Sequence, residues 1–317
     1  MSLHLIVGHG PAGAATAREL VGQGHQVRVV TRSGLPAGAA AEPGVEHLAL
    51  DATDAARLTE AAKGAVAIHS CAAPPLHRWT TAWPPLAASL FSAAEASGAV
   101  LVLLGNLYGY GPTAPAGPLT EELPLAATGP KGRTRAAIWE QAEALHEAGR
   151  IRAVEVRASD FFGPGVTEGG HLAARAVPRL LAGKGVSVLG DPDAPHSWTY
   201  LPDVARALAE AASDERAWGR AWHVPTLPAR SAREMVHGMA AAAGTTVPTV
   251  RRLPSSVLAL AGLFSPLLRE LKETRYQFDR PFVVDSSAYE AVFAVRATPL
   301  DEQFEATVEW WRGRTAA

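Results

Sequence analysis

A glycine-rich turn near the first residues constrains the fold of this chain more than any other feature. An apolar run, Leu3–Val7, leads into Gly8-His9-Gly10-Pro11-Ala12-Gly13, and a segment of helical period follows at once. In a GxGxxG turn the first glycine permits a sharp bend, the second lets backbone approach a pyrophosphate, and the third lets the helix pack on the strand. Free N–H groups at the helix start attract an anion, and a proline in the first turn loses no useful donor. We therefore expect dinucleotide binding rather than a plain tight turn.

Six short runs rich in Val, Leu and Ile alternate with Ala-rich segments of helical period. The runs are Leu3–Val7, Val27–Thr31, Val45–Leu50, Ala65–His69, Val100–Leu104 and Arg152–Val156, and the helical segments are Ala12–Gly22, Ala55–Ala62, Pro84–Ser97 and Thr134–Ala148. Strands that are apolar on both faces and alternate with helices indicate a parallel sheet covered on both sides. The sequence therefore predicts an α/β fold with a doubly wound Rossmann domain of six parallel strands.

Beyond Asp160 the pattern becomes less regular. We expect helices at Leu172–Ala182, Pro202–Leu208, Ala232–Ala243, Ser255–Leu271 and Asp301–Arg312, and strands at Val186–Leu189, Trp198–Leu201 and Phe282–Val284. Because no low-complexity linker separates these segments from the first part, they predict a smaller α/β substrate domain interleaved with the Rossmann domain. The expected boundaries are residues 1–160 with 197–224 for the Rossmann domain, and 161–196 with 225–317 for the substrate domain.

Composition narrows the class of protein further. Of 317 residues, 48% are hydrophobic and 19% charged, which is enough apolar material for a globular core. The 29 basic and 31 acidic residues nearly cancel, so no net field favours nucleic acid or a membrane surface as partner. Cys71 is the single cysteine, and no group of Cys and His has the spacing of a metal site. With neither a signal-like start nor an apolar run of ~20 residues, we expect a cytoplasmic protein.

The end of the second expected strand carries the choice between the two nicotinamide cofactors. An acidic residue there would accept hydrogen bonds from the ribose 2′-hydroxyl of NAD, whereas an arginine would pair with the 2′-phosphate of NADP. This chain has Thr31-Arg32-Ser33, with no acid. The sequence therefore predicts NADP, with NAD the weaker alternative. Asp51 and Ala52, after the third strand, are expected to bracket the adenine, although Asp51 is an equally good N-cap for the next helix.

Six motifs in order make the sequence resemble the extended short-chain dehydrogenase/reductases, the epimerase/dehydratase group. They are Gly8-His9-Gly10-Pro11-Ala12-Gly13, Leu50-Asp51-Ala52-Thr53-Asp54, Ala67-Ile68-His69-Ser70-Cys71-Ala72-Ala73, Leu107-Tyr108-Gly109-Tyr110-Gly111, Arg157-Ala158-Ser159-Asp160-Phe161-Phe162-Gly163-Pro164-Gly165 and Tyr200-Leu201-Pro202-Asp203-Val204-Ala205. The resemblance covers nearly the whole chain. It implies that Ser70, Cys71, Ala72 and Phe161 line the cofactor, and that the protein can form a homodimer.

The resemblance fails at the residues that carry the chemistry. The family uses a Ser, Tyr and Lys, and the matching positions here are Asn106, Lys131 and Arg135. If the segment after the fifth strand is extended, Asn106, Tyr108 and Tyr110 project to one side, at the carboxyl ends of the strands. We expect Tyr108 to give the proton, Asn106 to polarise a carbonyl, Lys131 to lower the phenol pKa and Arg135 to bind ribose hydroxyls. The alternative reading makes Tyr108 a packing residue and Lys131 part of an exposed turn.

Weaker candidates lie elsewhere. His171 and His196 can donate protons near neutral pH, although an exposed or capping role is the commoner one. Trp79 and Trp83 lie in a proline-rich segment that forms either a cleft wall or a cover over the core, and Cys71 is read as a packing residue rather than a nucleophile.

Three functions follow from these readings. The first is an NADP-dependent oxidoreductase, or an isomerase that uses a transient oxidation, acting on a small or medium carbonyl or hydroxyl compound. The second is a non-catalytic sensor or scaffold that binds NADP(H). The third is a nucleotide-sugar epimerase or dehydratase, in which Arg175, Arg179 and Arg275 would hold the diphosphate.

Overall fold

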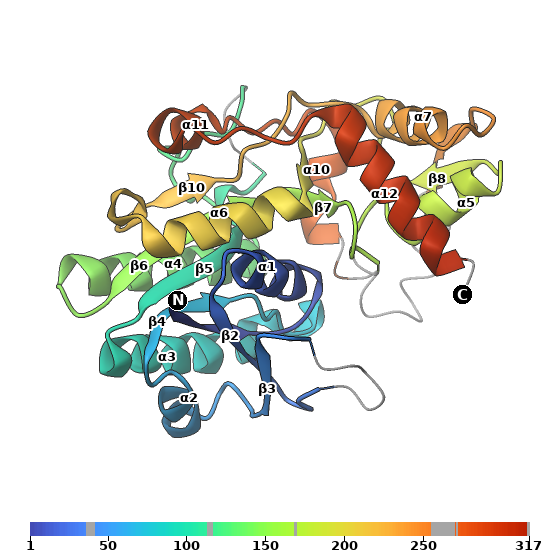
Figure 1. The fold of residues 1–317 in the computed structure, drawn as a ribbon. Coiled ribbons are helices and arrows are strands. Elements are labelled where there is room, and N and C mark those ends of the chain that lie inside the picture. The colour runs from blue at the N-terminus through green and yellow to red at the C-terminus, as the bar shows by residue number, and fades with distance from the viewer. Residues whose placement is uncertain (36–41, 113–116, 168–169, 255–269, 271, 316–317) are drawn as a thin grey trace. The chain divides into compact units, whose positions relative to one another are not determined.

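The computed structural model describes residues 1–35, 42–112, 117–167, 170–254, 270 and 272–315 (Figure 1). The chain divides into two compact units, each made of several segments. Unit 1 comprises Met1–Gly111, Leu125–Arg157 and Val204–Trp222, and unit 2 comprises Pro112–Pro124, Ala158–Asp203 and His223–Ala317. The chain therefore passes between the two units repeatedly.

A seven-stranded sheet in the order β10-β6-β5-β4-β1-β2-β3 forms the centre of unit 1. The strands are β1 (Leu3–Val7), β2 (Gln26–Thr31), β3 (Val45–Ala49), β4 (Ala65–Ser70), β5 (Val100–Asn106), β6 (Arg152–Ala158) and β10 (Ala221–His223). Strand β1 pairs in parallel with β2 and β4, and parallel pairing continues to β3 and β5. The predicted doubly wound α/β fold is confirmed, with β10 as a seventh strand that the sequence pattern did not predict.

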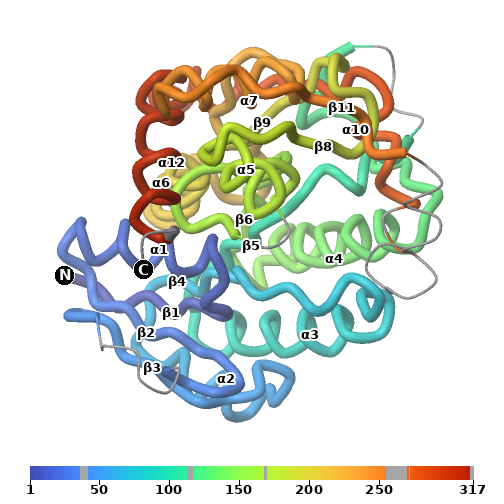
Figure 2. The backbone as a smooth tube through the Cα atoms, turned by 90° about the vertical axis from the view of Figure 1, so that its right-hand side faces the viewer, coloured from blue at the N-terminus to red at the C-terminus, as the bar shows by residue number. Residues whose placement is uncertain are grey.

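Helices cover both faces of this sheet. They are α1 (Pro11–Gly22), α2 (Ala55–Ala61), α3 (Trp79–Ser97), α4 (Pro130–Glu147) and α6 (Leu201–Ser213), with short 3-10 turns η1 (Leu76–Arg78), η2 (Tyr108–Tyr110) and η3 (Glu215–Ala217). One core cluster joins α2, α3 and α4 to the sheet, and another joins α1 and α6 to β1 and β2. Figure 2 shows α3 and α4 side by side on the same face.

Two of these helices begin earlier than predicted. Helix α3 starts at Trp79 rather than Pro84, so Pro84 and Pro85 lie inside it. Helix α4 starts at Pro130 rather than Thr134, and Lys131 is therefore a buried helix residue, not part of an exposed turn. Trp79 and Trp83 are buried in the α3 core cluster, which agrees with a cover over the core and excludes a freely exposed cleft wall.

Unit 2 is built from shorter elements. The strands are β7 (Asp160–Phe162), β8 (Val186–Val188), β9 (Trp198–Tyr200) and β11 (Val250–Arg252), paired in parallel as β7 with β9 and β8 with β11. Its helices are α5 (Val177–Leu181), α7 (Ala232–Ala242), α10 (Tyr276–Asp279), α11 (Ser287–Phe293) and α12 (Leu300–Thr315). The predicted helix Leu172–Ala182 reduces to α5, and Phe282–Val284 forms isolated bridges instead of a strand. The helix predicted at Ser255–Leu271 falls almost entirely outside the described residues.

Candidate functional site

The glycine-rich turn joins β1 to α1 in unit 1 with very close backbone packing. Gly8 has a φ of +99°, a conformation that favours glycine, and its N–H donates to the Val30 carbonyl over 2.9 Å. A Cβ on Gly8 would lie 2.6 Å from the Ala72 backbone, and one on Gly13 would overlap the Gly8 carbonyl oxygen. Both positions therefore require glycine for the turn to close.

Gly10 has no such packing constraint. It is the N-cap of α1, it makes no side-chain capping bond, and a Cβ there would meet nothing within 4 Å. Pro11 follows at the start of the helix, with Ala12 and Gly13 in the first turn. The protein itself therefore does not explain this glycine, whereas a pyrophosphate resting on the helix N-terminus would explain it. The turn fits a dinucleotide.

The end of β2 presents a cation beside a carboxylate. Arg32 and Ser33 are exposed, whereas the Thr31 hydroxyl donates to the Gly34 carbonyl over 2.9 Å. Hydrogen bonds from the Thr53 backbone and hydroxyl lower the pKa of Asp51, and the charge of Arg32 adds to this effect. The helix α2 is capped instead by Asp54, which accepts from the Arg57 N–H. Asp51 is thus left in a turn near Arg32 and is not the N-cap.

Two histidines pack together beside the glycine-rich turn. The rings of His9 and His47 meet edge to face with centroids 5.0 Å apart. Burial, followed by the charges of His47 and Arg18, lowers the pKa of His9, and Glu42 opposes this shift. His9 Nε2 and both ring nitrogens of His47 are buried without a hydrogen-bond partner. The pair supplies hydrogen-bonding atoms that the described protein does not use.

The residues after β4 form the floor of the turn. The Cys71 N–H donates to the Val7 carbonyl over 2.9 Å, which places Ser70, Cys71 and Ala72 against the end of β1. Burial raises the pKa of the Cys71 thiol to about 12, despite a hydrogen bond with Thr16. Cys71 is therefore a packing residue rather than a nucleophile.

The segment after β5 is not extended, so the predicted one-sided row of Asn106, Tyr108 and Tyr110 is wrong. Asn106 ends β5, and its Oδ1 accepts from the Tyr108 N–H over 3.1 Å, which turns the chain into η2. Tyr108 remains partly exposed and packs on Trp79, with ring centroids 5.6 Å apart. Tyr110 is buried.

Arg135 belongs to a buried ionic network that joins α4 to β5 and to the middle of β6. Its Nη2 donates to the Leu104 carbonyl over 2.9 Å and to Glu155 over 3.1 Å, and its guanidinium lies over the Trp83 ring. Arg157 donates to the same carboxylate over 2.7 Å and to the Tyr110 hydroxyl over 2.8 Å. Because its Nη2 is engaged twice and its side chain is only 4% exposed, Arg135 does not present its guanidinium to solvent for ribose hydroxyls.

In unit 2, His171 and His196, the two weaker candidates for a proton donor, lie near the carboxylate of Asp160. His196 Nε2 is 3.0 Å from Asp160 Oδ2, at the start of β7, and the His171 ring stacks on Phe278 with centroids 4.3 Å apart. Burial opposes ionisation of Asp160, but the hydrogen bond and charge of His196 bring its pKa below the usual range. Burial lowers the pKa of His171 to about 4. Phe161, also in β7, is half-buried.

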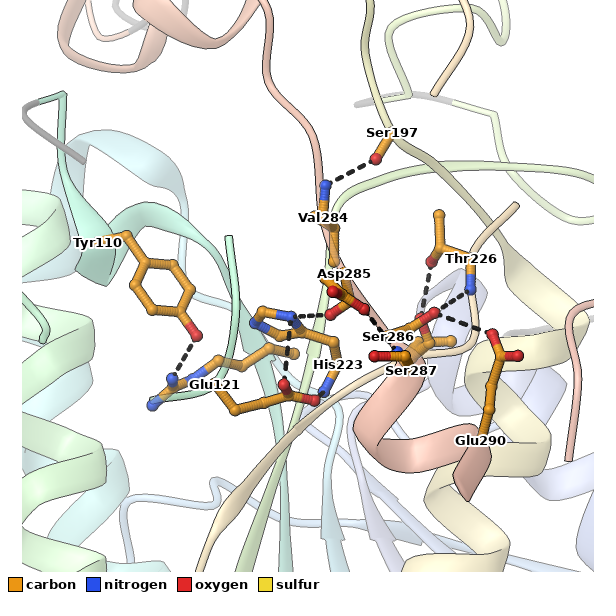
Figure 3. A network of polar contacts seen from close by, with 12 residues as sticks. Tyr110, Glu121, Ser197, His223, Thr226, Val284, Asp285, Ser286, Ser287 and Glu290 are labelled. Carbon is orange, nitrogen blue, oxygen red and sulfur yellow. Dashed lines mark hydrogen bonds and ion pairs between the residues drawn. The ribbon is translucent and has the colours of Figure 1, made fainter. Parts of the chain in front are cut away.

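A second polar network of unit 2 joins its segments and is structural (Figure 3). The His223 N–H donates to Glu121 over 2.9 Å, and its Nδ1 donates to the Asp285 carbonyl over 2.8 Å. The Ser286 hydroxyl accepts from the Thr226 N–H over 3.1 Å and donates to Glu290 over 3.2 Å. These bonds tie Glu121 to the end of β10, and the end of β10 to the residues that open α11.

Two features are absent from the part of the chain that the structure describes. It contains no cluster of three or more His, Cys, Asp or Glu side chains arranged to hold a metal ion. Its helices include none with the length and apolar character needed to cross a membrane.

A family model described as the NAD dependent epimerase/dehydratase family matches residues 4–224. No curated protein matches the chain in sequence. Among solved structures, a dTDP-glucose 4,6-dehydratase from Bacillus anthracis in complex with NAD has a TM-score of 0.79 at 16% identity, covering 100% of this chain and 98% of that one. A UDP-glucose 4-epimerase from Thermus thermophilus in complex with NAD has a TM-score of 0.75 at 20% identity, covering 98% and 99%. These two likenesses establish the fold.

Proposed function

Because the chain belongs to the NAD-dependent epimerase/dehydratase family, we propose that it is an NADP-dependent oxidoreductase, or an isomerase that uses a transient oxidation, acting on a small or medium carbonyl or hydroxyl compound. The observation that carries this proposal is Gly10. It caps α1 with open space where a Cβ would lie, so a dinucleotide pyrophosphate can reach the helix N-terminus.

The cofactor would be held by residues of three strand ends. Gly8, His9 and Gly10, with the first turn of α1, would face the pyrophosphate, and Asp51 and Ala52 would bracket the adenine. Ser70, Cys71 and Ala72, at the end of β4, would lie beneath it. When bound, the nicotinamide supplies or accepts a hydride.

Selection of NADP would rest on Arg32. Its exposed guanidinium after β2 can form paired charge-assisted hydrogen bonds with a 2′-phosphate, and no acidic residue takes the position that would hold the 2′-hydroxyl of NAD. Solved relatives contain NAD, so the choice needs a direct measurement. Titration of the protein with NADPH and NADH tests it: tighter NADPH binding is expected, and equal affinities would reject NADP selection.

Proton transfer would fall to Tyr108. It is partly exposed, it follows the carboxyl end of β5, and its backbone is fixed by Asn106. A phenol donates a proton best when a nearby cation lowers its pKa, and Lys131 in α4 is the candidate for that role. Asn106 would polarise the substrate carbonyl. Arg135 is left out because Glu155 and the Leu104 carbonyl engage it.

A second candidate function is a sensor that binds NADP(H) without turnover. One observation favours the sensor. Arg135, at the position of the family's catalytic lysine, forms a buried ion pair with Glu155. Incubation with NADPH and a panel of aldehydes, ketones and hydroxy-ketones separates the two candidates. Consumption of NADPH would support the enzyme, and tight NADPH binding with no consumption across the panel would favour the sensor.

A further inference from the structure

The backbone of Tyr108 is fixed from two sides. Its N–H donates to Asn106 Oδ1 over 3.1 Å, and its carbonyl accepts from the Gly111 N–H over 3.1 Å. Helix α4 packs against the same carbonyl, since a Cβ on Gly132 would overlap the Tyr108 carbonyl oxygen. With its backbone held, Tyr108 can change its phenol direction only by rotation about its side-chain bonds. That direction therefore depends on the groups that contact the ring.

Trp79, the first residue of α3, contacts that ring. The two ring centroids are 5.6 Å apart and the ring planes are inclined by 31°, a separation at which aromatic rings attract each other. Trp79 is buried, and its indole N–H donates to the Pro74 carbonyl over 2.9 Å, which fixes the orientation of the indole. Tyr108 is partly exposed. A buried and anchored ring thus sets the direction of a partly exposed one.

Trp83 fixes Trp79 from the other side. It follows one turn later in α3, and the two rings meet edge to face at 87° with centroids 6.0 Å apart. Arg135 Cζ in turn lies 4.6 Å from the centroid of the Trp83 ring, and Arg135 is held by the buried ionic network described above. All of these residues belong to unit 1, so the whole stack lies within one compact unit.

From these contacts we infer that Trp79 is a positioning residue of the proposed site, which holds the Tyr108 phenol in one orientation for proton transfer. The phenol proton passes to the substrate carbonyl oxygen during reduction, and the phenolate left on Tyr108 takes a proton from water. A donor must come within about 2.6–3.2 Å of the accepting atom, and a displacement of about 1 Å can cost roughly a hundredfold in rate. The inference rests on the proposed function and adds to it the residue that orients the donor.

Nuclear magnetic resonance of the tyrosine rings tests the stack without any substrate. The chain has five tyrosines, and the Tyr108 signal is the one that Tyr108→Phe removes. In the wild-type protein, the Tyr108 ring protons should be displaced by the ring current of Trp79 and should show nuclear Overhauser contacts to it. Absence of these contacts in the wild-type protein would overturn the inference, whether or not variants of Trp79 fold.

Two variants of α3 complete this measurement. Trp79→Leu keeps an apolar side chain but removes the ring, so the Tyr108 signal should move toward the position of free tyrosine. Phe91→Leu removes another buried aromatic ring of the same core cluster, about 18 Å further along the helix, and should leave the signal in place. An unchanged Tyr108 signal in Trp79→Leu would contradict the stack.

Steady-state kinetics with NADPH and a carbonyl compound that the protein reduces separate positioning from simple packing. Trp79→Leu should lower kcat by roughly tenfold to a hundredfold, with NADPH affinity and the KM of the carbonyl compound unchanged. Trp79→Phe, which keeps an aromatic face against Tyr108, should restore most of the lost turnover. Phe91→Leu should retain the wild-type kcat. Equal losses of kcat in Trp79→Leu and Phe91→Leu would assign Trp79 to packing alone and overturn the inference.

Tyr108→Phe, measured beside these variants, distinguishes failure of the inference from failure of the proposed function. Full activity of Tyr108→Phe would reject Tyr108 as the proton donor, and with it the proposed function on which the inference rests. Lost turnover in Tyr108→Phe together with a wild-type kcat in Trp79→Leu would reject the inference alone.

Discussion

A Cβ on Gly13 would overlap the carbonyl oxygen of Gly8, so α1 packs against the end of β1 only because residue 13 is glycine. Since the obstacle is backbone, it cannot rotate away. We expect Gly13→Ala to lower the free energy of unfolding by roughly 1–3 kcal/mol, the usual cost of overpacking. Denaturant titration measures this change. Gly22→Ala, also in α1 but with nothing within 4 Å of its Cβ, should be neutral or stabilising, and equal losses for both variants would contradict the packing argument.

Gly10→Ala should weaken NADPH binding without lowering the stability of the fold. Its Cβ meets no protein atom, so the melting temperature should stay near that of the wild type. A methyl group at the helix N-terminus should nevertheless block the pyrophosphate and weaken NADPH binding at least tenfold, about 1.4 kcal/mol. Fluorescence titration beside thermal melts gives both quantities. Unchanged NADPH affinity would place the dinucleotide elsewhere.

Arg32→Glu should reverse the cofactor preference. The substitution removes the cation that would pair with a 2′-phosphate and supplies an acceptor for the 2′-hydroxyl of NAD. We expect NADPH affinity to fall by roughly tenfold to a hundredfold, the equivalent of one or two charge-assisted hydrogen bonds. NADH affinity should stay the same or rise. Equal losses of affinity for NADPH and NADH would show that Arg32 does not distinguish the 2′-phosphate from the 2′-hydroxyl.

The two tyrosines of η2 should respond differently to loss of the hydroxyl. Tyr108→Phe should lower turnover by about 10²- to 10⁴-fold, the contribution of a general acid, with cofactor affinity unchanged. Tyr110→Phe removes the 2.8 Å bond from Arg157 and should cost roughly 1.5–3 kcal/mol of stability instead. Steady-state kinetics and denaturant titration on both variants test the assignment. Full activity of Tyr108→Phe would exclude it as the proton donor.

Two buried histidines in unit 1 should make the fold sensitive to acid. His4 Nδ1 lies 3.1 Å from His69 Nε2; burial and the charge of His25 lower the pKa of His4 to about 4, and burial and the charge of His4 lower that of His69 to about 3. The unfolded chain, in which both pKa values are near 6.5, therefore binds more protons from pH 6.5 down to about 4 for His4 and about 3 for His69. Stability should be full above that range and fall by at most about 1.4 kcal/mol per pH unit for each ring as the pH drops through it.

His69→Leu should flatten this pH dependence. His77→Gln changes an exposed histidine and serves as the control, with a profile like that of the wild type. Unfolding midpoints measured across the acid range provide the comparison. A His69→Leu profile as steep as the wild-type one would show that the buried rings do not govern acid stability.

The sequence predicted the elements whose signals are local. An apolar run followed by glycines at fixed spacing identified β1, the turn and α1. This pattern is recognisable in the sequence because the turn can form only with glycine at certain positions. The start of α3 was missed because Pro84 and Pro85 read as a break, although both lie within the helix. Strand β10 was missed because a strand of three residues is too short to show a recognisable hydrophobic pattern.

Contacts between residues that are far apart in the chain could not be predicted from local sequence patterns. His196 bonds Asp160 and the Gln277 carbonyl across 36 and 81 residues of chain, and nothing near any of the three marks the meeting. Arg135 was expected at the cofactor, whereas it binds Glu155. Glu155 fits beside residue 105 only because that residue is glycine, since a Cβ on Gly105 would lie 2.7 Å from the Glu155 carboxylate. The direction of a side chain at the end of a strand depends on its neighbours, and only the folded structure supplies them.

Titration of the purified protein with NADPH, and then with NADH, tests the central claim most directly. If the backbone amides of the α1 N-terminus hold a dinucleotide and Arg32 selects its ribose, NADPH should bind saturably and more tightly than NADH. Gly10→Ala should lose that binding while keeping its melting temperature. Absence of any saturable response to either nucleotide, from protein with a cooperative melt, would contradict the account.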